Sequence, residues 1–134
     1  MYKEILKKAN LKVTPVRKQV IERLENSDFA LAPQEIEQAF EQIDRVTLYR
    51  TLKSFEQKGI IHKVNDGTGI DKYAMCEQEC TEDHHHDEHI HFNCDQCGNT
   101  YCVDEIKVPS IAMPEGFRVK STNVVVKGVC KQCN

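Results

Sequence analysis

The stretch DRVTLYRTLKSFEQKGIIHKV, residues 44–64, predicts a helix followed directly by a strand. Its apolar residues at helical spacing are Leu48, Leu52 and Phe55. Gly59 is expected to end the helix, and the apolar GIIHKV after it has the composition of a strand. Turn residues NDGTG and a second strand in IDKYAM would complete a hairpin. A helix with a two-stranded wing is therefore expected.

Three shorter helices are expected before this one. The first covers residues 2–9, and the second begins where Thr14 is a suitable N-cap and Pro15 suits the first helical position. Pro33 would open the third, whose apolar face includes Ala39 and Phe40. Helices closed by a wing describe a winged helix-turn-helix.

The polar face of the helix in 44–64 has the composition of a DNA-recognition surface. Its residues are Arg45, Thr47, Tyr49, Arg50 and Lys53. Arginine suits guanine edges and phosphates, and threonine and tyrosine suit backbone or thymine-methyl contacts. Arg17, in an earlier helix, and Lys12, just before it, add positive charge. The alternative is an ordinary solvated helix face, and the hairpin after Gly59 favours DNA.

Charge is divided unevenly along the chain. Residues 1–63 carry twelve Lys and Arg against nine Asp and Glu, whereas residues 64–134 carry six against twelve. All seven Cys and five of the six His lie in the second part. This division suggests a basic half that meets a polyanion and an acidic half that binds cations, with ordinary surface variation as the alternative.

The chain has no apolar run long enough to span a membrane, and its N-terminal residues MYKEILKKAN lack the apolar core of a signal peptide. We therefore expect a cytoplasmic protein with no membrane association. In a reducing compartment, seven cysteines suggest metal ligands before disulfides.

Four cysteines form two CxxC motifs 32 residues apart, and they are Cys94, Cys97, Cys130 and Cys133. Each motif offers two thiolates at the spacing that a tetrahedral metal requires, so together they predict a structural Zn²⁺ site. A redox CxxC or chance pairing is the alternative.

Further metal-binding side chains remain once these four are assigned. On a strand, His89 and His91 would project to the same side, and Cys102 follows nearby. The earlier candidates are His62 in the first wing strand, Cys76 at the end of the wing, and Cys80 with His84–His86 in a polar stretch. Some of them are expected to hold a second metal that ties the two halves together, whereas His84–His86 are more simply polar loop residues.

Together these residues resemble the ferric uptake regulator family of bacterial metal-responsive repressors. The matching segments are LKVTPVRKQVIERL, RVTLYRTLKSFEQKGIIHKV, the HIHFNCDQCG block and the final CKQC. The resemblance implies a homodimer, a structural zinc held by four cysteines, and a regulatory metal that closes the dimer onto double-stranded operator DNA. It implies an α+β chain with a winged helix-turn-helix domain (residues 1–76), a linker or loop (77–88) and a small α/β dimerisation domain with the four-cysteine zinc site (89–134).

Carried over by residue, the resemblance assigns roles to several positions. His89 and His91 fall on the family's paired regulatory histidines, and Cys102 falls where the family usually has Asp or Glu. Tyr49 and Arg50 fall on the DNA-contacting pair, and Arg17 on a further phosphate or base contact. His62 and Cys76 look like ligands of zinc-sensing members.

Departures from the family pattern point to the metal. Iron and peroxide sensors usually take a histidine from the segment before the third helix, and residues 29–32 here read Phe-Ala-Leu-Ala. Several members of the family have a further metal site, whose ligands would fall here on Glu88, Ile90, Pro109 and Val126. Of these, only Glu88 has a side chain that can coordinate a metal. Soft thiolates with imidazoles favour zinc over ferrous iron.

The expected function is thus a zinc-responsive repressor. One alternative is an iron- or redox-responsive repressor of the same family, with Cys76, Cys80 and Cys102 as oxidisable thiols. A zinc hydrolase or deaminase is the other alternative. The deaminase signature has a proline directly before its CxxC motif, and no proline precedes Cys94. A fully coordinated zinc site also has no position for an activated water.

Overall fold

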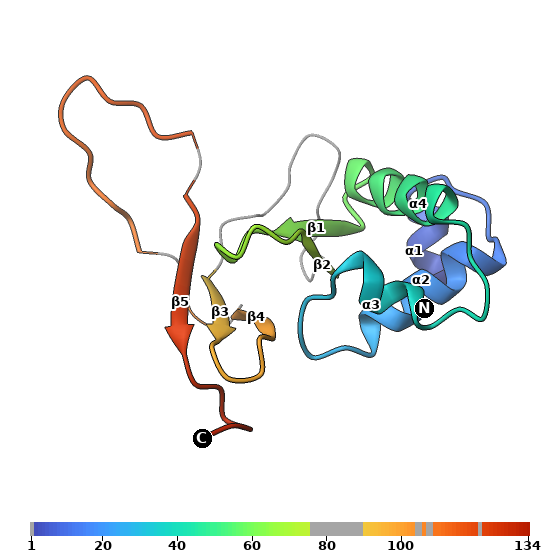
Figure 1. Ribbon diagram of the computed structural model, residues 1–134. Coiled ribbons are helices and arrows are strands. Elements are labelled where there is room, and N and C mark those ends of the chain that lie inside the picture. Colours follow the sequence, from blue (N-terminus) through green and yellow to red (C-terminus); the bar gives the residue numbers. More distant parts are fainter. Residues whose placement is uncertain (1, 76–89, 104–105, 107–108, 121) are drawn as a thin grey trace.

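A computed structural model describes residues 2–75, 90–103, 106, 109–120 and 122–134 (Figure 1). Its helices are α1 (Tyr2–Lys8), α2 (Pro15–Glu25), α3 (Pro33–Glu37) and α4 (Arg45–Gln57). Its strands are β1 (Ile61–Val64), β2 (Lys72–Met75), β3 (Ile90–Cys94), β4 (Thr100–Val103) and β5 (Val124–Gly128). The expected α+β class, with a winged helix-turn-helix at its start, is confirmed.

The four helices enclose the hydrophobic core. Leu48, Leu52 and Phe55 of α4 are fully buried there, as the spacing predicts. The Thr14 hydroxyl accepts a hydrogen bond from the backbone N–H of Arg17 at 3.2 Å, so α2 begins with the expected cap. Gly59, just after α4, has a φ of 77°, a left-handed conformation that glycine adopts without strain.

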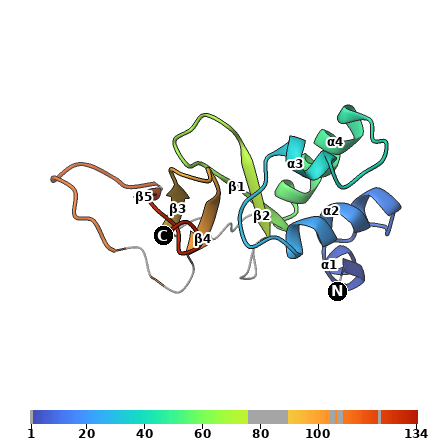
Figure 2. The same ribbon diagram turned by 60° about the horizontal axis from the view of Figure 1, so that its bottom comes forward.

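The wing is the antiparallel pair β1–β2, in which His62 lies opposite Ala74. It lies between the helices and the second sheet in both views (Figures 1 and 2). The segment before α3 also reaches the second sheet, because the Ala30 N–H donates to the Thr100 carbonyl at 2.8 Å. Leu31 pairs with Tyr73 of β2, so this segment joins the wing to β4.

The second sheet has the order β4-β3-β5, with β3 antiparallel to β4 and parallel to β5. On β3 and β4, His91 lies opposite Cys102, and Asn93 lies opposite Thr100. Because side chains alternate along a strand, these two pairs lie on one face of the sheet.

Two expectations about elements are wrong. The third helix ends at Glu37, and Ala39 and Phe40 lie in a following turn whose N–H groups bond to carbonyls three residues earlier. The segment FRVKS (117–121) has a composition that predicts a strand, but its described residues 117–120 form none and pair with no strand in the described part of the chain.

The domain boundaries remain a prediction, since the expected linker at 77–88 and both of its junctions lie outside the described residues. Within the described part of the chain, no helix is both long and apolar enough to cross a membrane.

Candidate metal centres and DNA-binding face

The first metal centre is built where β3 and β5 end side by side. Cys94 is the last residue of β3 and pairs with Gly128 of the parallel β5. The CxxC motif at the end of β3 therefore lies next to the CxxC motif that follows β5. The four Sγ atoms of Cys94, Cys97, Cys130 and Cys133 lie within 4.8 Å of one another. The Cys97 and Cys130 sulfurs are 3.9 Å apart. Tetrahedral zinc with Zn–S bonds of about 2.3 Å requires about 3.8 Å, so the thiols fit the ion.

The thiols of this cluster differ in how readily they ionise. The backbone N–H groups of Cys97 (3.5 Å) and Cys130 (3.4 Å) point at the Cys94 sulfur, and they lower the pKa of the Cys94 thiol from 9.0 to about 6. The neighbouring Cys130 sulfur and burial raise the pKa of Cys133 to about 12. One thiol is thus ionised easily and another resists ionisation until a cation compensates the gathered negative charge.

The second centre brings together three side chains from three strands: His62 of β1, His91 of β3 and Cys102 of β4. Their ligand atoms lie within 4.8 Å of one another. His62 Nε2 is 3.6 Å from Cys102 Sγ, and the two imidazole rings stack with centroids 6.3 Å apart. Nitrogen and sulfur ligands of one tetrahedral zinc are about 3.6 Å apart, so this donor set also fits the ion.

Other predicted ligands cannot be placed. Cys76 directly follows β2 in the sequence and His89 directly precedes β3, but both lie outside the described residues, as do Cys80 and His84–His86. The three described ligands come from the wing and from the second sheet. The structure therefore brings together, across the two halves, residues that the sequence analysis assigned to one site.

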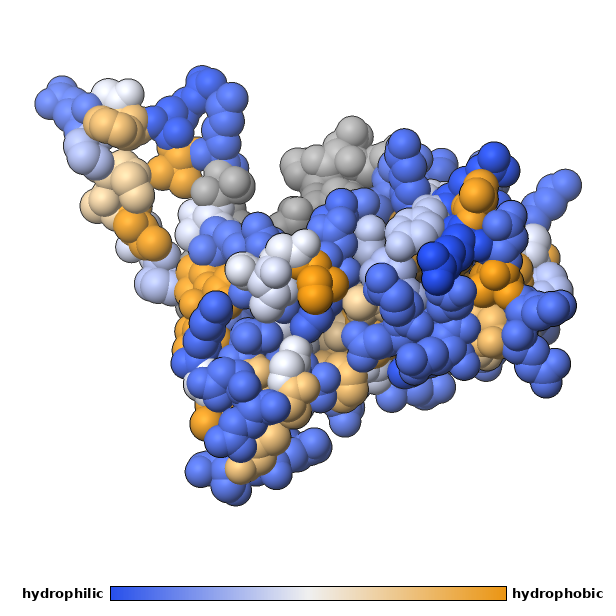
Figure 3. All heavy atoms as spheres, viewed as in Figure 1, coloured by the Kyte–Doolittle hydropathy of each residue, from blue (hydrophilic) through white to orange (hydrophobic). Residues whose placement is uncertain are grey.

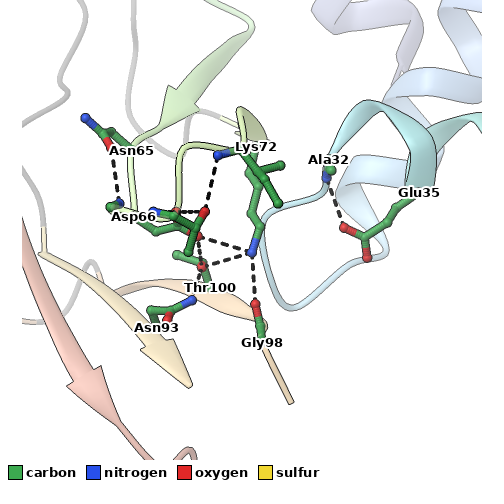
Figure 4. Close-up of polar contacts among 11 residues, drawn as sticks. Ala32, Glu35, Asn65, Asp66, Lys72, Asn93, Gly98 and Thr100 are labelled. Atoms are coloured by element: carbon green, nitrogen blue, oxygen red, sulfur yellow. Dashed lines mark hydrogen bonds and ion pairs between the residues drawn. The ribbon is translucent and has the colours of Figure 1, made fainter. Parts of the chain in front are cut away.

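A polar cluster next to the second centre was missed by the sequence analysis (Figure 4). Asp66, in the wing turn, is fully buried and accepts a hydrogen bond from the Thr100 hydroxyl at 2.6 Å. Lys72 Nζ is 3.2 Å from the same carboxylate and donates to the Gly98 carbonyl at 2.9 Å. The Asn93 amide donates to the Thr100 hydroxyl at 2.9 Å. No local motif marks these residues, because Asp66 and Lys72 lie 26 to 34 positions before the residues that they contact near β4.

Hydrogen bonds hold the Asp66 carboxyl ionised. Burial acts to raise its pKa, but the bonds from Thr100, Thr68 and Lys72 outweigh burial and place the pKa well below its usual range. A buried carboxylate and a buried lysine therefore form a charged pair where the wing meets the second sheet.

The expected DNA-binding face is accessible. The α4 residues Arg45, Thr47, Tyr49, Arg50 and Lys53 are all exposed. The Arg45 guanidinium lies 3.6 Å from the Glu37 carboxylate. Arg17 donates to the Lys12 carbonyl at 2.8 Å, which holds those two residues together at the start of α2.

A winged helix joined to clusters of thiols and imidazoles defines a class of protein, the metal-binding DNA-binding regulators. Residues 8–130 match the sequence profile of the ferric uptake regulator family, and the chain belongs to that family. The protein is accordingly a metal-responsive transcription regulator and not an enzyme. The hydrolase or deaminase alternative is set aside.

Three similar proteins illustrate the match. The ferric uptake regulation protein of Legionella pneumophila is 31% identical over 137 residues, which cover 96% of this chain and 95% of that protein. The ferric uptake regulator Fur of Helicobacter pylori has a TM-score of 0.63 at 21% identity, covering 99% and 93% of the two chains. A zinc uptake regulator complexed with zinc and DNA has a TM-score of 0.65 at 21% identity, covering 98% and 89%.

Proposed function

We propose that this protein is a zinc-responsive repressor that binds double-stranded operator DNA as a homodimer in the cytoplasm. Cys94, Cys97, Cys130 and Cys133 hold a structural zinc ion. The regulatory ligands are drawn from His62, Cys76, His89, His91 and Cys102. The DNA contacts are Lys12, Arg17, Arg45, Thr47, Tyr49, Arg50 and Lys53.

The observation that carries the proposal is the separation of 3.6 Å between His62 Nε2 and Cys102 Sγ. His62 belongs to the wing and Cys102 to β4, so the two ligands come from opposite sides of the joint between the halves. A bound divalent cation would supply a link between them. Such a cation binds most tightly when these side chains lie close together. Its binding therefore favours the arrangement of helices in which they do so.

The donor set supports zinc over ferrous iron. Cys102 contributes a thiolate where relatives that prefer harder ligands would use a carboxylate, and thiolates favour zinc. The segment before α3 also lacks a metal ligand. Ala30 and Leu31 make backbone pairs with Thr100 and Tyr73 there. The relatives named for ferric uptake and the structural neighbour that binds zinc leave both metals to be tested.

Coupling between zinc and DNA follows from linkage. If zinc binds the DNA-competent arrangement more tightly than the others, operator affinity rises by the same factor as the preference. Thiols and imidazoles must lose protons to bind a metal, so the response weakens in acid.

The test is a titration of zinc and ferrous iron into protein that carries only its structural zinc, followed by operator binding. We expect zinc to activate DNA binding at lower free concentration than iron. Cys102→Asp, which replaces the thiolate with a harder ligand, should reduce this preference by about tenfold or more while the four-cysteine zinc remains.

Activation by ferrous iron alone at sub-micromolar free metal would refute the zinc assignment and favour the iron-responsive alternative. The redox-responsive alternative predicts reversible loss of DNA binding and release of zinc on mild oxidation. An unchanged metal preference in Cys102→Asp would exclude Cys102 from the regulatory ligands.

A further inference from the structure

One residue of the wing turn, Asp66, is buried against the second sheet, whereas the rest of the turn is exposed. The Asp66 side chain is fully buried and accepts a hydrogen bond from Thr100 of β4. The neighbouring Asn65 carbonyl accepts a hydrogen bond from the Asn123 amide at 3.1 Å, just before β5. The turn is therefore held from two sides by the second sheet.

The contacts between wing and sheet form two adjacent tiers. One tier is the candidate regulatory centre, with His62 of the wing against the facing pair of His91 and Cys102. The other is the polar cluster, with Asp66 of the wing against the next pair, Asn93 and Thr100. Both pairs lie on one face of the sheet and are two residues apart along each strand. The polar tier therefore fixes the position of the wing directly beside the metal ligands.

The polar tier also reaches the four-cysteine centre. Lys72 Nζ donates to the carbonyl of Gly98, the residue that follows Cys97. The Thr100 carbonyl accepts from Ala30, and the Tyr101 ring lies edge-on to Phe29 with centroids 5.9 Å apart. Contacts from the wing and from the segment before α3 thus converge on residues 98–101, which directly follow the first CxxC motif.

We propose that Asp66, Lys72 and Thr100 are positioning residues that lock the wing turn onto β4 without the regulatory metal and so hold His62 against His91 and Cys102. The contact between the wing turn and β4 is the joint between the two halves. The joint positions ligands of the regulatory site, so this inference deepens the proposed function. The role of the joint in metal sensing rests on that function.

A purely stabilising role would be a weak explanation for this cluster. A buried ion pair contributes little net stability compared with well-packed apolar residues, since both charges lose their hydration. What the pair supplies is geometry: the carboxylate accepts bonds from three groups and its lysine partner bonds to two further oxygen atoms. Such a network fixes one orientation, and ligands that are already aligned bind their metal more tightly.

The test is amide hydrogen exchange by NMR on protein with structural zinc and no regulatory metal. The Ala30 N–H reports the joint directly, because it donates across it to Thr100. Thr100→Val removes the hydroxyl but keeps the backbone, and we expect exchange at Ala30 to accelerate by about tenfold to one-hundredfold. Thr100→Ser, which retains the hydroxyl, should restore slow exchange.

Thr68→Val is the matched control. The Thr68 hydroxyl donates to the same Asp66 carboxylate, but from within the wing turn. Thr68→Val should leave the exchange rate at Ala30 within about threefold of that in the original protein, because no contact across the joint is lost. Exchange at Leu52 in α4 and at Cys94 in the cysteine centre should stay unchanged in all three variants, which separates opening of the joint from unfolding.

Equal acceleration in Thr68→Val and Thr100→Val, or none in Thr100→Val, would overturn the inference. A second measurement is zinc affinity at the regulatory site by competition with a chelator, where Thr100→Val should weaken binding by about tenfold and Thr100→Ser should not. If the original protein takes up no second zinc, the proposed function fails, while the exchange experiment still decides whether the joint exists.

Discussion

At the scale of single residues, the thiols of the four-cysteine centre differ in how readily they lose a proton. Two backbone N–H groups lower the pKa of Cys94 from 9.0 to about 6, so the fold favours its thiolate. In metal-free protein, this preference stabilises the folded state fully above about pH 9 and is lost as the pH falls through 6. Cys133 has the opposite shift, because its neighbouring thiols oppose a further negative charge.

We predict that zinc binding to the metal-free centre releases fewer than four protons per ion at pH 7.5, because Cys94 is already ionised. The number should rise by about one as the pH is lowered through 6. Calorimetry in buffers of different ionisation enthalpy measures it, with zinc kept below one equivalent per chain. Proton release that stays constant between pH 7.5 and 5.5 would contradict the assigned state of Cys94.

At the scale of elements, α4 combines a buried face with an exposed cationic face. The Asp44 carboxylate caps its first turn by accepting from the Val46 N–H at 3.2 Å. Leu48 and Leu52 anchor the helix in the core, while Arg50 and Tyr49 point to solvent. Changes on the exposed face can therefore alter DNA contacts without disturbing the fold.

We predict that Arg50→Ala weakens binding to operator DNA by about tenfold or more, the usual effect of losing an arginine contact to a base or phosphate. Melting temperature and metal content should not change, since the side chain is exposed. Lys7→Ala removes a cation from the exposed face of α1 and serves as the control. Equal loss of affinity in both variants, measured by fluorescence anisotropy at one salt concentration, would show that only net charge matters.

The same helix shows what sequence can predict about the elements. Its buried positions repeat at helical spacing and its ends carry recognisable residues, so its bounds follow from local chemistry. By contrast, Ala39 and Phe40 also fit a helical face, yet α3 stops at Glu37. Residues 117–120 have strand composition, but they pair with no strand among the described residues. In both cases the outcome depends on tertiary contacts that composition does not encode.

At the scale of the whole molecule, long-range metal ligands were easier to predict than long-range hydrogen bonds. Cysteine and histidine are uncommon and their spacings are diagnostic, so both clusters could be assembled from the sequence as far as the described residues reach. Asp66, Lys72 and Thr100 are common residue types in a turn and two strands. Nothing local signals that burial will bring together a carboxylate and a hydroxyl 34 positions apart.

Residues 109–120 form an arm whose exposed apolar side chains indicate contact with a partner chain. The arm extends away from the remaining chain in Figure 1, and apolar side chains cover part of it in Figure 3. Phe117 is 70% exposed, and Ile111 and Val119 are each more than half exposed. Clustered apolar exposure of this kind marks an interface. A second copy of the chain is the partner that the proposed homodimer supplies.

We predict that Phe117→Glu raises the dissociation constant of the homodimer by about tenfold or more, because a large apolar side chain at an interface is replaced by a charge. Ile70→Glu is the control: Ile70 is 54% exposed but lies in the wing turn, away from the arm in the sequence. Sedimentation equilibrium of both variants with structural zinc measures the effect. Operator binding should fall with dimerisation in Phe117→Glu, since two half-sites are then no longer bound together. If Phe117→Glu stays as dimeric as Ile70→Glu, the arm is not the dimer interface.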